Sequence, residues 1–221
     1  MGRLTVRTPA TRRIALGWVM AALCLAISGP ALAHPHLLIT VETTVVYENG
    51  ALAGLQHAWT FDEMNSAAEI EGLDKNGDGK YDRAELQELA DLYAQRLKAV
   101  SFFTHAKLAN QAIQFGSAKD PWVDYKNNVI TLHFTAPFAK PVLPEAQGLT
   151  FSVSDPSFYI AFSLAEKNDA VRFSSGAPTI CKARITDGEA PQPSGLQESF
   201  AAFNAFGLSL PKTVHLECKA S

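Results

Sequence analysis

The sequence predicts a mainly β protein, an antiparallel β-sandwich or curled barrel, with an EF-hand helix-loop-helix inserted between its strands. Short apolar segments separated by Asn, Pro, Gly and Ser recur through most of the chain, which is typical of antiparallel sheets. One segment at about 83–100 has apolar residues at helical spacing instead. A twelve-residue loop rich in Asp, Asn and Gly precedes it. We therefore expect a helical insertion at about 62–100.

The first 33 residues read as a secretion signal. Four arginines and no acidic residue precede or interrupt an apolar run at 14–27, and Ala31-Leu32-Ala33 fits the signal peptidase pattern. Cleavage after Ala33 would release a periplasmic protein that begins at His34. The apolar run is too short to span a bilayer comfortably, so the cleaved protein is not expected to be membrane-spanning. Arg12-Arg13 partly matches a twin-arginine signal, which leaves the export route open.

The charge balance of the exported part argues against nucleic acid as a partner. Removing the four signal arginines from the 19 basic residues leaves 15 against 22 acidic residues, a formal net charge of −7. Phosphate binding needs clustered positive charge, so cations are the better expectation.

A strand, a tight turn and a second strand are predicted over 37–61. Asn49-Gly50 is a strong hairpin signal, because both residues tolerate positive φ. Helices are then expected at 62–73 and from Arg83 to about Val100. The second helix has one apolar face, formed by Leu86, Leu89, Tyr93, Leu97 and Val100.

Strands return after residue 102, in an order that makes the helices an insertion between the second and third strands. A polar segment at 186–195 follows the predicted β domain (34–185), and a short helix at 197–206 and a strand ending at Cys218 follow in the tail (186–221). The predicted strands are Leu108–Phe115, Trp122–Tyr125, Val129–Phe134, Leu149–Val153, Phe158–Leu164, Val171–Phe173 and Thr179–Ile185.

Two cysteines remain after signal cleavage, Cys181 and Cys218. An even pair in an oxidising compartment favours a disulfide that ties the tail to the β domain. The rival interpretation, a thiolate metal site, lacks the Cys-x-x-Cys spacing that is typical of such sites.

The loop at 74–85 matches the calcium-binding template at each position that the chemistry requires. Oxygen ligands fall at positions one, three, five, nine and twelve, a backbone carbonyl at seven, and Gly79 supplies the turn at six. We expect Ca²⁺ here, as a structural clamp more than as a sensor, because no second loop is found to pair with this one. The predicted ligands are Asp74, Asn76, Asp78, Lys80, Asp82 and Glu85.

Signal cleavage would also create a transition-metal site at the new N-terminus. The α-amine and imidazole of His34 could chelate one ion, with His36 on the same face of the first strand. Pro35 has no amide N–H, so a square-planar site that uses an amide nitrogen is excluded. Imidazole ligands suit Ni²⁺, Co²⁺, Zn²⁺ and Cu²⁺, and the sequence does not choose among them. The alternative is a frayed terminus.

The other histidines of the exported chain are weaker candidates, because a lone histidine is usually an ordinary core or surface residue. His57 is the best of them, since the hairpin could bring its strand beside the first. The remaining three are His105, His133 and His215.

Four motifs together resemble the bacterial domain-of-unknown-function family numbered 1007. They are His34-Pro35-His36, the Trp-Thr-Phe-Asp-Glu segment at 59–63, the loop at 74–85, and the segment from Asp155 to Phe162. The resemblance implies a periplasmic component of an uncharacterised transport system, often associated with nickel/cobalt-type membrane permeases. It assigns no role to Asp155, a weak candidate ligand that also reads as a turn residue before Pro156.

Three functions compete. The first is a metal-binding accessory protein of a divalent transition-metal transport system, partnered by a membrane metal permease. The second is a calcium-stabilised periplasmic module that binds a ligand or protein, without transition-metal function. The third is a copper oxidase with an N-terminal histidine brace, for which only His57 or His133 could supply the second imidazole. No nucleophile elbow or phosphate loop appears, so the expected protein is not an enzyme.

Overall fold

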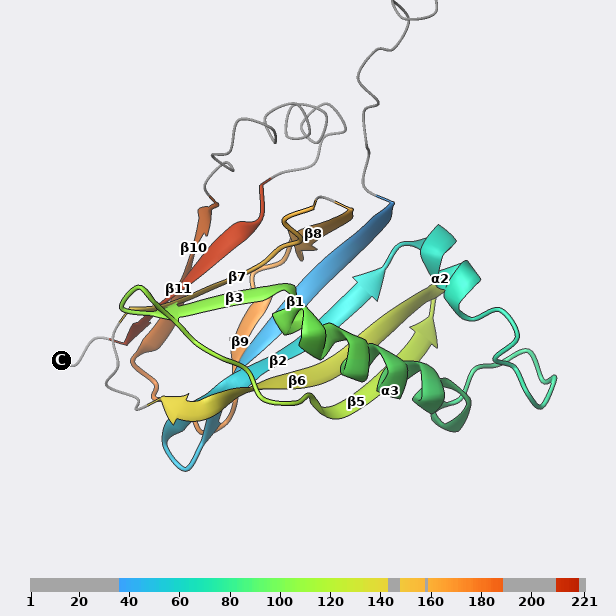
Figure 1. Ribbon diagram of the computed structural model, residues 1–221, viewed down its shortest axis with the longest axis horizontal. Helices are drawn as coiled ribbons and strands as arrows, with labels where there is room; N and C mark the ends of the chain where they lie inside the picture. Colours follow the sequence, from blue (N-terminus) through green and yellow to red (C-terminus); the bar gives the residue numbers. More distant parts are fainter. Residues whose placement is uncertain (1–35, 143–147, 158, 189–209, 219–221) are drawn as a thin grey trace, which may run out of the picture. The chain divides into compact units, whose positions relative to one another are not determined.

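The structure is a computed structural model that describes residues 36–142, 148–157, 159–188 and 210–218. Two β-sheets and two helices make up this part of the chain (Figure 1). The predicted signal at 1–33, His34 and the predicted tail helix at 197–206 lie outside the described residues.

The predicted hairpin is confirmed and lies at the centre of the first sheet. β1 (Leu37–Glu48) pairs with β2 (Ala51–Phe61) in antiparallel register, and the turn residues Asn49 and Gly50 have φ of 51° and 77°. Alternate residues of both strands are buried, as the period of two in a strand requires. One face of the hairpin therefore belongs to the core.

The first sheet has the order β5-β6-β2-β1-β8, with β9 also paired to β1. Its β8 and β9 run parallel to β1, so the prediction of a purely antiparallel sheet is wrong at this edge. The parallel pairing is available because the chain returns from the second sheet before it reaches β8. The bounds are β5 (Lys119–Lys126), β6 (Val129–Val142), β8 (Ile160–Leu164) and β9 (Val171–Phe173).

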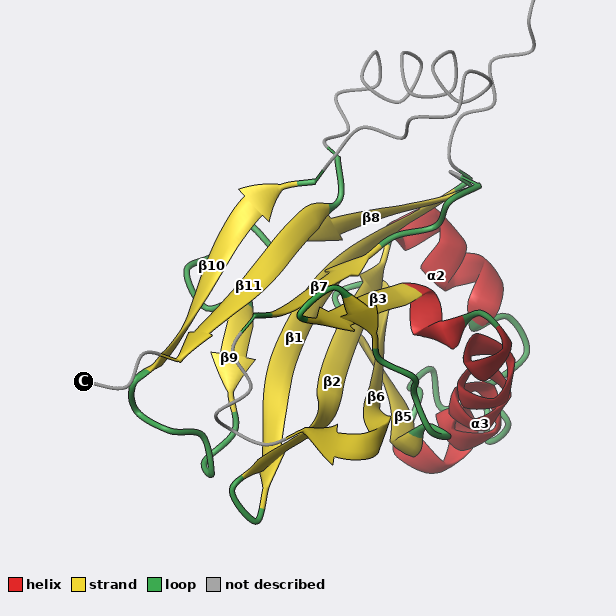
Figure 2. Ribbon diagram, turned by 60° about the vertical axis from the view of Figure 1, so that its left-hand side comes forward, coloured by secondary structure: helices red, strands yellow, loops and turns green. Residues whose placement is uncertain are grey.

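The second sheet has the order β10-β11-β7-β3-β4 and is separate from the first (Figure 2). The two sheets do not close into a barrel. Of the two predicted architectures, a sandwich and a curled barrel, the barrel is therefore wrong. β11, from the predicted tail, lies between β10 and β7 as an inner strand. The bounds are β3 (Thr104–Leu108), β4 (Gln111–Ala112), β7 (Leu149–Val153), β10 (Cys181–Asp187) and β11 (Lys212–Cys218).

One of the strand predictions needs correction. The segment predicted as one strand over 108–115 is broken after β3, where Ala109 and Asn110 have φ of 46° and 70°. These left-handed residues turn the chain back, so that β4 pairs with β3 instead of extending it. Beyond this turn, Phe115 forms only an isolated bridge to Phe138 of β6.

The helices α2 (Glu63–Glu69) and α3 (Arg83–Ala99) lie between β2 and β3, which confirms the predicted insertion. α2 is shorter than the 62–73 predicted. The side chain of Asp62 caps α2, and Asp82 forms a reciprocal capping box with Glu85 at the start of α3. A short 3-10 turn, η1 (Ser101–Phe103), leads from α3 into β3.

The core has two parts that share the first sheet. Under the helices, Trp59 meets the ring of Phe134 edge-on at 5.0 Å and belongs to the same buried cluster as Leu86 and Leu89. Between the two sheets, Leu55 belongs to a second cluster with residues of β7 and β11. The helices and the second sheet thus divide between them the apolar face of the first sheet.

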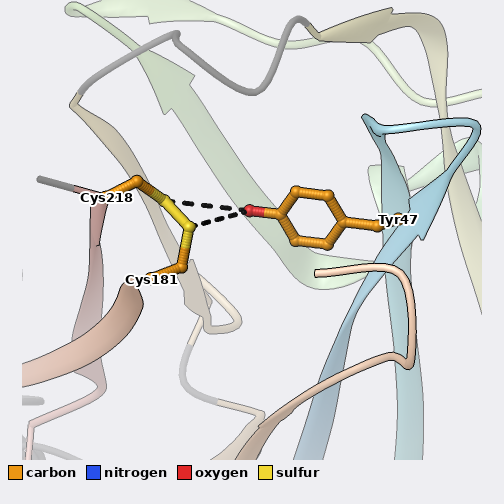
Figure 3. The surroundings of a disulfide bond; sticks show 3 residues. All are labelled: Tyr47, Cys181 and Cys218. Atoms are coloured by element: carbon orange, nitrogen blue, oxygen red, sulfur yellow. Dashed lines mark hydrogen bonds between the residues drawn. A yellow bond between two sulfur atoms is a disulfide. The ribbon is translucent and has the colours of Figure 1, made fainter. Parts of the chain in front are cut away.

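The predicted disulfide joins Cys181 and Cys218, which face each other across β10 and β11 (Figure 3). The Tyr47 hydroxyl lies 3.6 Å and 3.9 Å from the two sulfur atoms, so the bond rests against β1. Of the helices in the described part, none is long and apolar enough to cross a membrane.

Removing the disulfide should destabilise the protein. The bond joins residues 37 apart in the sequence, and closing a loop of that length is worth about 3 to 4 kcal/mol in the chain-entropy model. We expect a loss of that size in the free energy of unfolding of the Cys181→Ser/Cys218→Ser double variant, measured by urea denaturation. Reductant should destabilise the native protein equally and leave the double variant unchanged. A loss below about 1 kcal/mol would contradict this role.

Candidate functional site

The loop at 74–85 is folded around its own backbone amides. Gly77 and Gly79 have φ of 73° and 75°, a conformation that glycine adopts without strain. Asp74 accepts hydrogen bonds through Oδ1 from the Gly77 amide at 2.8 Å and through Oδ2 from the Gly79 amide at 3.0 Å. The first predicted ligand thus already points into the loop.

Glu85 closes the other end of the loop. Its Oε1 accepts from the amides of Lys75 at 3.1 Å and Asn76 at 3.3 Å, and its Oε2 accepts from the Asp82 amide at 3.1 Å. The residue is only 8% exposed, which is low for an acidic side chain in a surface loop. Both ends of the loop therefore direct carboxylate oxygens toward its interior.

The remaining predicted ligands are held by short local bonds. The Asn76 side chain accepts from the Asp78 amide and the Asp78 side chain accepts from the Lys80 amide, both at 2.8 Å. Across the described residues, no three His, Cys, Asp or Glu side chains come together in an arrangement that could hold a metal ion. Calcium binding by this loop stays a prediction that rests on its sequence pattern.

His36 is exposed at the start of β1, and its backbone is held from two sides. Its amide donates to the carbonyl of Tyr159 at 2.9 Å, and its own carbonyl accepts from the Asn65 side chain at 3.1 Å. The imidazole packs on the Tyr159 ring with centroids 4.8 Å apart. The first described residue, two positions after the predicted N-terminus at His34, is therefore fixed in position.

Asp62 joins this end of β1 to α2. Its carboxylate accepts from the Leu38 amide at 3.0 Å and from the Asn65 amide at 2.9 Å. Partial burial alone would raise the pKa of Asp62, but these hydrogen bonds to the ionised form hold it below its ordinary value. The same short helix therefore supports the start of β1 and leads toward the acidic loop.

Asp155 anchors the turn before β8. The two carboxylate oxygens of Asp155 accept hydrogen bonds of 2.7–3.0 Å from the Ser157 amide, the Ser157 hydroxyl and the Ile160 amide. Since Ile160 pairs with Leu37, this turn lies at the same end of β1 as His36. The donors around the carboxylate favour the turn interpretation over a role as a metal ligand.

His57 is fully buried and is not brought near His36. It pairs with Thr43, seven residues along β1 from His36, or roughly 23 Å at the rise of a strand. Its Nδ1 lies 3.0 Å from the Thr43 hydroxyl and its Nε2 lies 3.4 Å from that of Thr104 in the second sheet. Burial lowers the pKa of His57 to about 3, so the ring is neutral and bridges the two sheets.

Two of the other histidines have ordinary partners. His105 is exposed, with Nε2 at 3.3 Å from the Ser154 carbonyl, and the Nε2 of His215 lies 3.0 Å from the Thr186 hydroxyl. The third, His133, has a different setting, because it lines a polar hollow of about 440 Å³ on the outer face of the first sheet. This hollow was not predicted from the sequence.

Comparison with known proteins places the chain in one family. The profile of a family described as protein of unknown function (DUF1007) matches residues 19–218. The chain belongs to the DUF1007 family. An uncharacterized protein of Haemophilus influenzae is also similar, with 31% identity over 151 residues that cover 67% of this chain and 71% of the relative. The resemblance noted from the four motifs is thus confirmed, while the transport context stays a prediction.

The hollow of this DUF1007 protein could have been anticipated only in part. Alternating polar residues in β1, β2 and β6 indicate a solvated sheet face. Which of them lie side by side depends on the strand order and register, and these follow from pairings between distant segments.

The buried His57 should make the stability of the DUF1007 protein depend on pH. Its folded pKa of about 3 is below the unfolded value of 6.5, so the unfolded state binds the proton first as the pH falls. The stability that is linked to this group is fully present above about pH 6.5 and is lost progressively as the pH falls toward 3. We expect a loss of about 2 kcal/mol between pH 7 and pH 5 from this group alone.

Urea denaturation at several pH values measures this loss. His57→Gln, which cannot titrate but keeps hydrogen-bonding groups, should reduce the loss between pH 7 and pH 5 by about the same 2 kcal/mol. His105→Gln, at an exposed position, is the matched control and should behave as the native protein. An equal pH dependence in native and His57→Gln proteins would overturn the assignment.

Proposed function

We propose that this DUF1007 protein is a periplasmic metal-binding accessory protein of a divalent transition-metal transport system, with no catalytic activity of its own. The observation that carries the proposal is the anchored start of β1. His36 is exposed, while hydrogen bonds from its amide and to its carbonyl fix its backbone. Cleavage after Ala33 would place a bidentate amine-imidazole ligand two residues before this anchor.

The ion at this site would be Ni²⁺, Co²⁺, Zn²⁺ or Cu²⁺, since imidazole and amine nitrogens suit all four. One imidazole beside an N-terminal chelate leaves coordination positions open to solvent. Such an incomplete site suits exchange of the ion with a partner, and we propose a membrane metal permease as that partner.

Calcium would have a separate, structural role in the acidic loop. The carboxylates of Asp74 and Glu85 already point inward, and the two glycines already have positive φ. Replacing the amide contacts with one cation would neutralise the mutual repulsion of Asp74, Asp78 and Glu85. The ion would then connect the end of α2 to the start of α3.

A second candidate function is a calcium-stabilised module that binds a small ligand, and the polar hollow favours it. A histidine-brace copper oxidase is the weakest of the three. Its brace would need a second imidazole near the N-terminus, whereas His57, on β2 opposite Thr43, is buried between the sheets far from the start of β1.

The mature N-terminus should bind one transition-metal ion. Calorimetric titration of correctly processed protein with Ni²⁺ or Cu²⁺ should show a tight phase of one ion per chain, because amine and imidazole close a chelate. Adding one Ser before His34 should remove this tight phase, and so should His34→Ala with His36→Ala. His105→Gln serves as the control. A mature protein that starts at another residue, as shown by mass spectrometry, would overturn the proposal.

Calcium should stabilise the protein through the acidic loop. At a calcium concentration 100-fold above the dissociation constant, mass action adds about 2.7 kcal/mol, which corresponds to a rise of about 5 to 10 °C in Tm. Asp74→Asn with Glu85→Gln should abolish the rise in a thermal melt. Asp91→Asn, an acidic position on α3 outside the loop, is the control and should retain it. Equal shifts in all three proteins would contradict the assignment.

A further inference from the structure

The hollow on the outer face of the first sheet is built from two neighbouring cross-strand rows. In the first row, Glu42, Ala58, His133 and Trp122 lie side by side on β1, β2, β6 and β5. Ala58 is the smallest member, so it leaves a gap between Glu42 and His133. In the second row, Asp124 of β5 pairs with Thr131 of β6, two residues from His133 on the same face.

The imidazole of His133 has a fixed orientation in this row. It stacks on the Trp122 ring with centroids 3.8 Å apart and planes 5° apart. The guanidinium of Arg83, at the start of α3, lies 4.8 Å from the centre of the same indole. Desolvation lowers the pKa of His133, so the ring is neutral at pH 7 and carries a lone pair.

The Nε2 atom of His133 is buried and has no hydrogen-bond partner among the described residues. Buried polar atoms are normally satisfied, so an orphan of this kind needs an explanation. The nearest carboxylate oxygen is Asp124 Oδ2 at 3.8 Å, which is too far for a hydrogen bond. Two ligands of one ion can stand that far apart, because metal–nitrogen and metal–oxygen bonds of about 2.0–2.2 Å together span up to about 4.2 Å.

The Asp124 carboxylate already has a cationic partner, the side chain of Lys126. Lys126 Nζ lies 2.9 Å from the same Oδ2, and its side chain is 74% exposed. An exposed ammonium can swing into solvent at little cost, because surface ion pairs contribute little to stability. Across the hollow, Glu42 is paired with both Lys167 and Arg172, so it adds no uncompensated charge.

We propose that His133 Nε2 and Asp124 Oδ2, which line the hollow on the outer face of the first sheet, form a second binding site for a divalent transition-metal ion. Imidazole with carboxylate suits zinc, nickel, cobalt and copper, and solvent completes the coordination. Two protein ligands make a weak, rapidly exchanging site. The site depends on neither the processed N-terminus nor the calcium loop, so it goes beyond the proposed function.

The test uses protein with one Ser before His34, which silences the N-terminal chelate, in saturating calcium, which occupies the acidic loop. Titration with Zn²⁺ alone in a calorimeter should show one-to-one binding. Asp124→Asn and His133→Gln should each weaken it at least about tenfold, because even the loss of a residue that only orients a metal ligand typically costs about 10- to 100-fold in affinity. Lys126→Met should strengthen it about threefold by removing the competing ammonium. His105→Gln should leave it unchanged.

Trp122 offers a second readout. Cu²⁺ bound at His133 should quench the fluorescence of the stacked indole, and Trp122→Phe should remove this quenching while Zn²⁺ binding persists. The proposal is overturned if the extended protein binds no Zn²⁺, or if Asp124→Asn and His133→Gln bind as the parent does. Loss of binding in these two variants, with an unchanged thermal melt, supports it. The protein without the added Ser reports separately on the N-terminal site.

Discussion

The burial of one face of the β1–β2 hairpin is the constraint on which the rest of this structure depends. Both strands are long, and their inward residues run from Ile39 and Phe61 at one end to Tyr47 and Leu52 at the other. No single element covers a face of that length. The helices bury the end around Trp59, and the second sheet buries the end around Leu55. The position of every other element follows from this division.

His57 lies near the meeting point of the two coverings and is the polar exception inside the core. Its neutral ring connects Thr43 beside it to Thr104 in the second sheet, while Trp59 and Phe134 pack around it. A buried histidine with both nitrogens near hydroxyls is costly to charge. The residue therefore links the sheets at neutral pH, and we expect it to make the protein sensitive to acid.

The proposed metal sites lie on the surfaces that the core leaves free. α2 supports the start of β1 through Asp62 and Asn65, so the proposed N-terminal site and the acidic loop share one short helix. The outer face of the first sheet is left without a covering layer by the described residues, and its cross-strand rows bring His133 and Asp124 together. Each of the two proposed transition-metal sites would combine few protein ligands with open coordination, as the proposed transfer of an ion to a partner requires.

Local chemistry was enough to predict much of the fold. Asn49-Gly50 indicated the hairpin, the spacing of Leu86, Leu89 and Leu97 indicated α3, and the two cysteines indicated their disulfide. The acidic loop is likewise a local pattern. The hairpin, the helix and the loop depend on interactions between residues close in the sequence. The disulfide could be predicted because only two cysteines, Cys181 and Cys218, follow the predicted signal.

The tertiary structure decided what depends on contacts between distant segments. Three features have no clear local signal in the sequence. They are the parallel pairing of β8 and β9 with β1, the inner position of β11, and the left-handed turn after β3. The burial of His57 and the pairing of His133 with Trp122 depend on register. By itself the sequence determined the hairpin, the helices, the acidic loop and the disulfide partners, because local backbone preferences and redox chemistry specify them. Only the order and register of the strands decided which distant side chains lie together on a sheet face or in the core. That order is set by the whole chain as it buries its apolar surface.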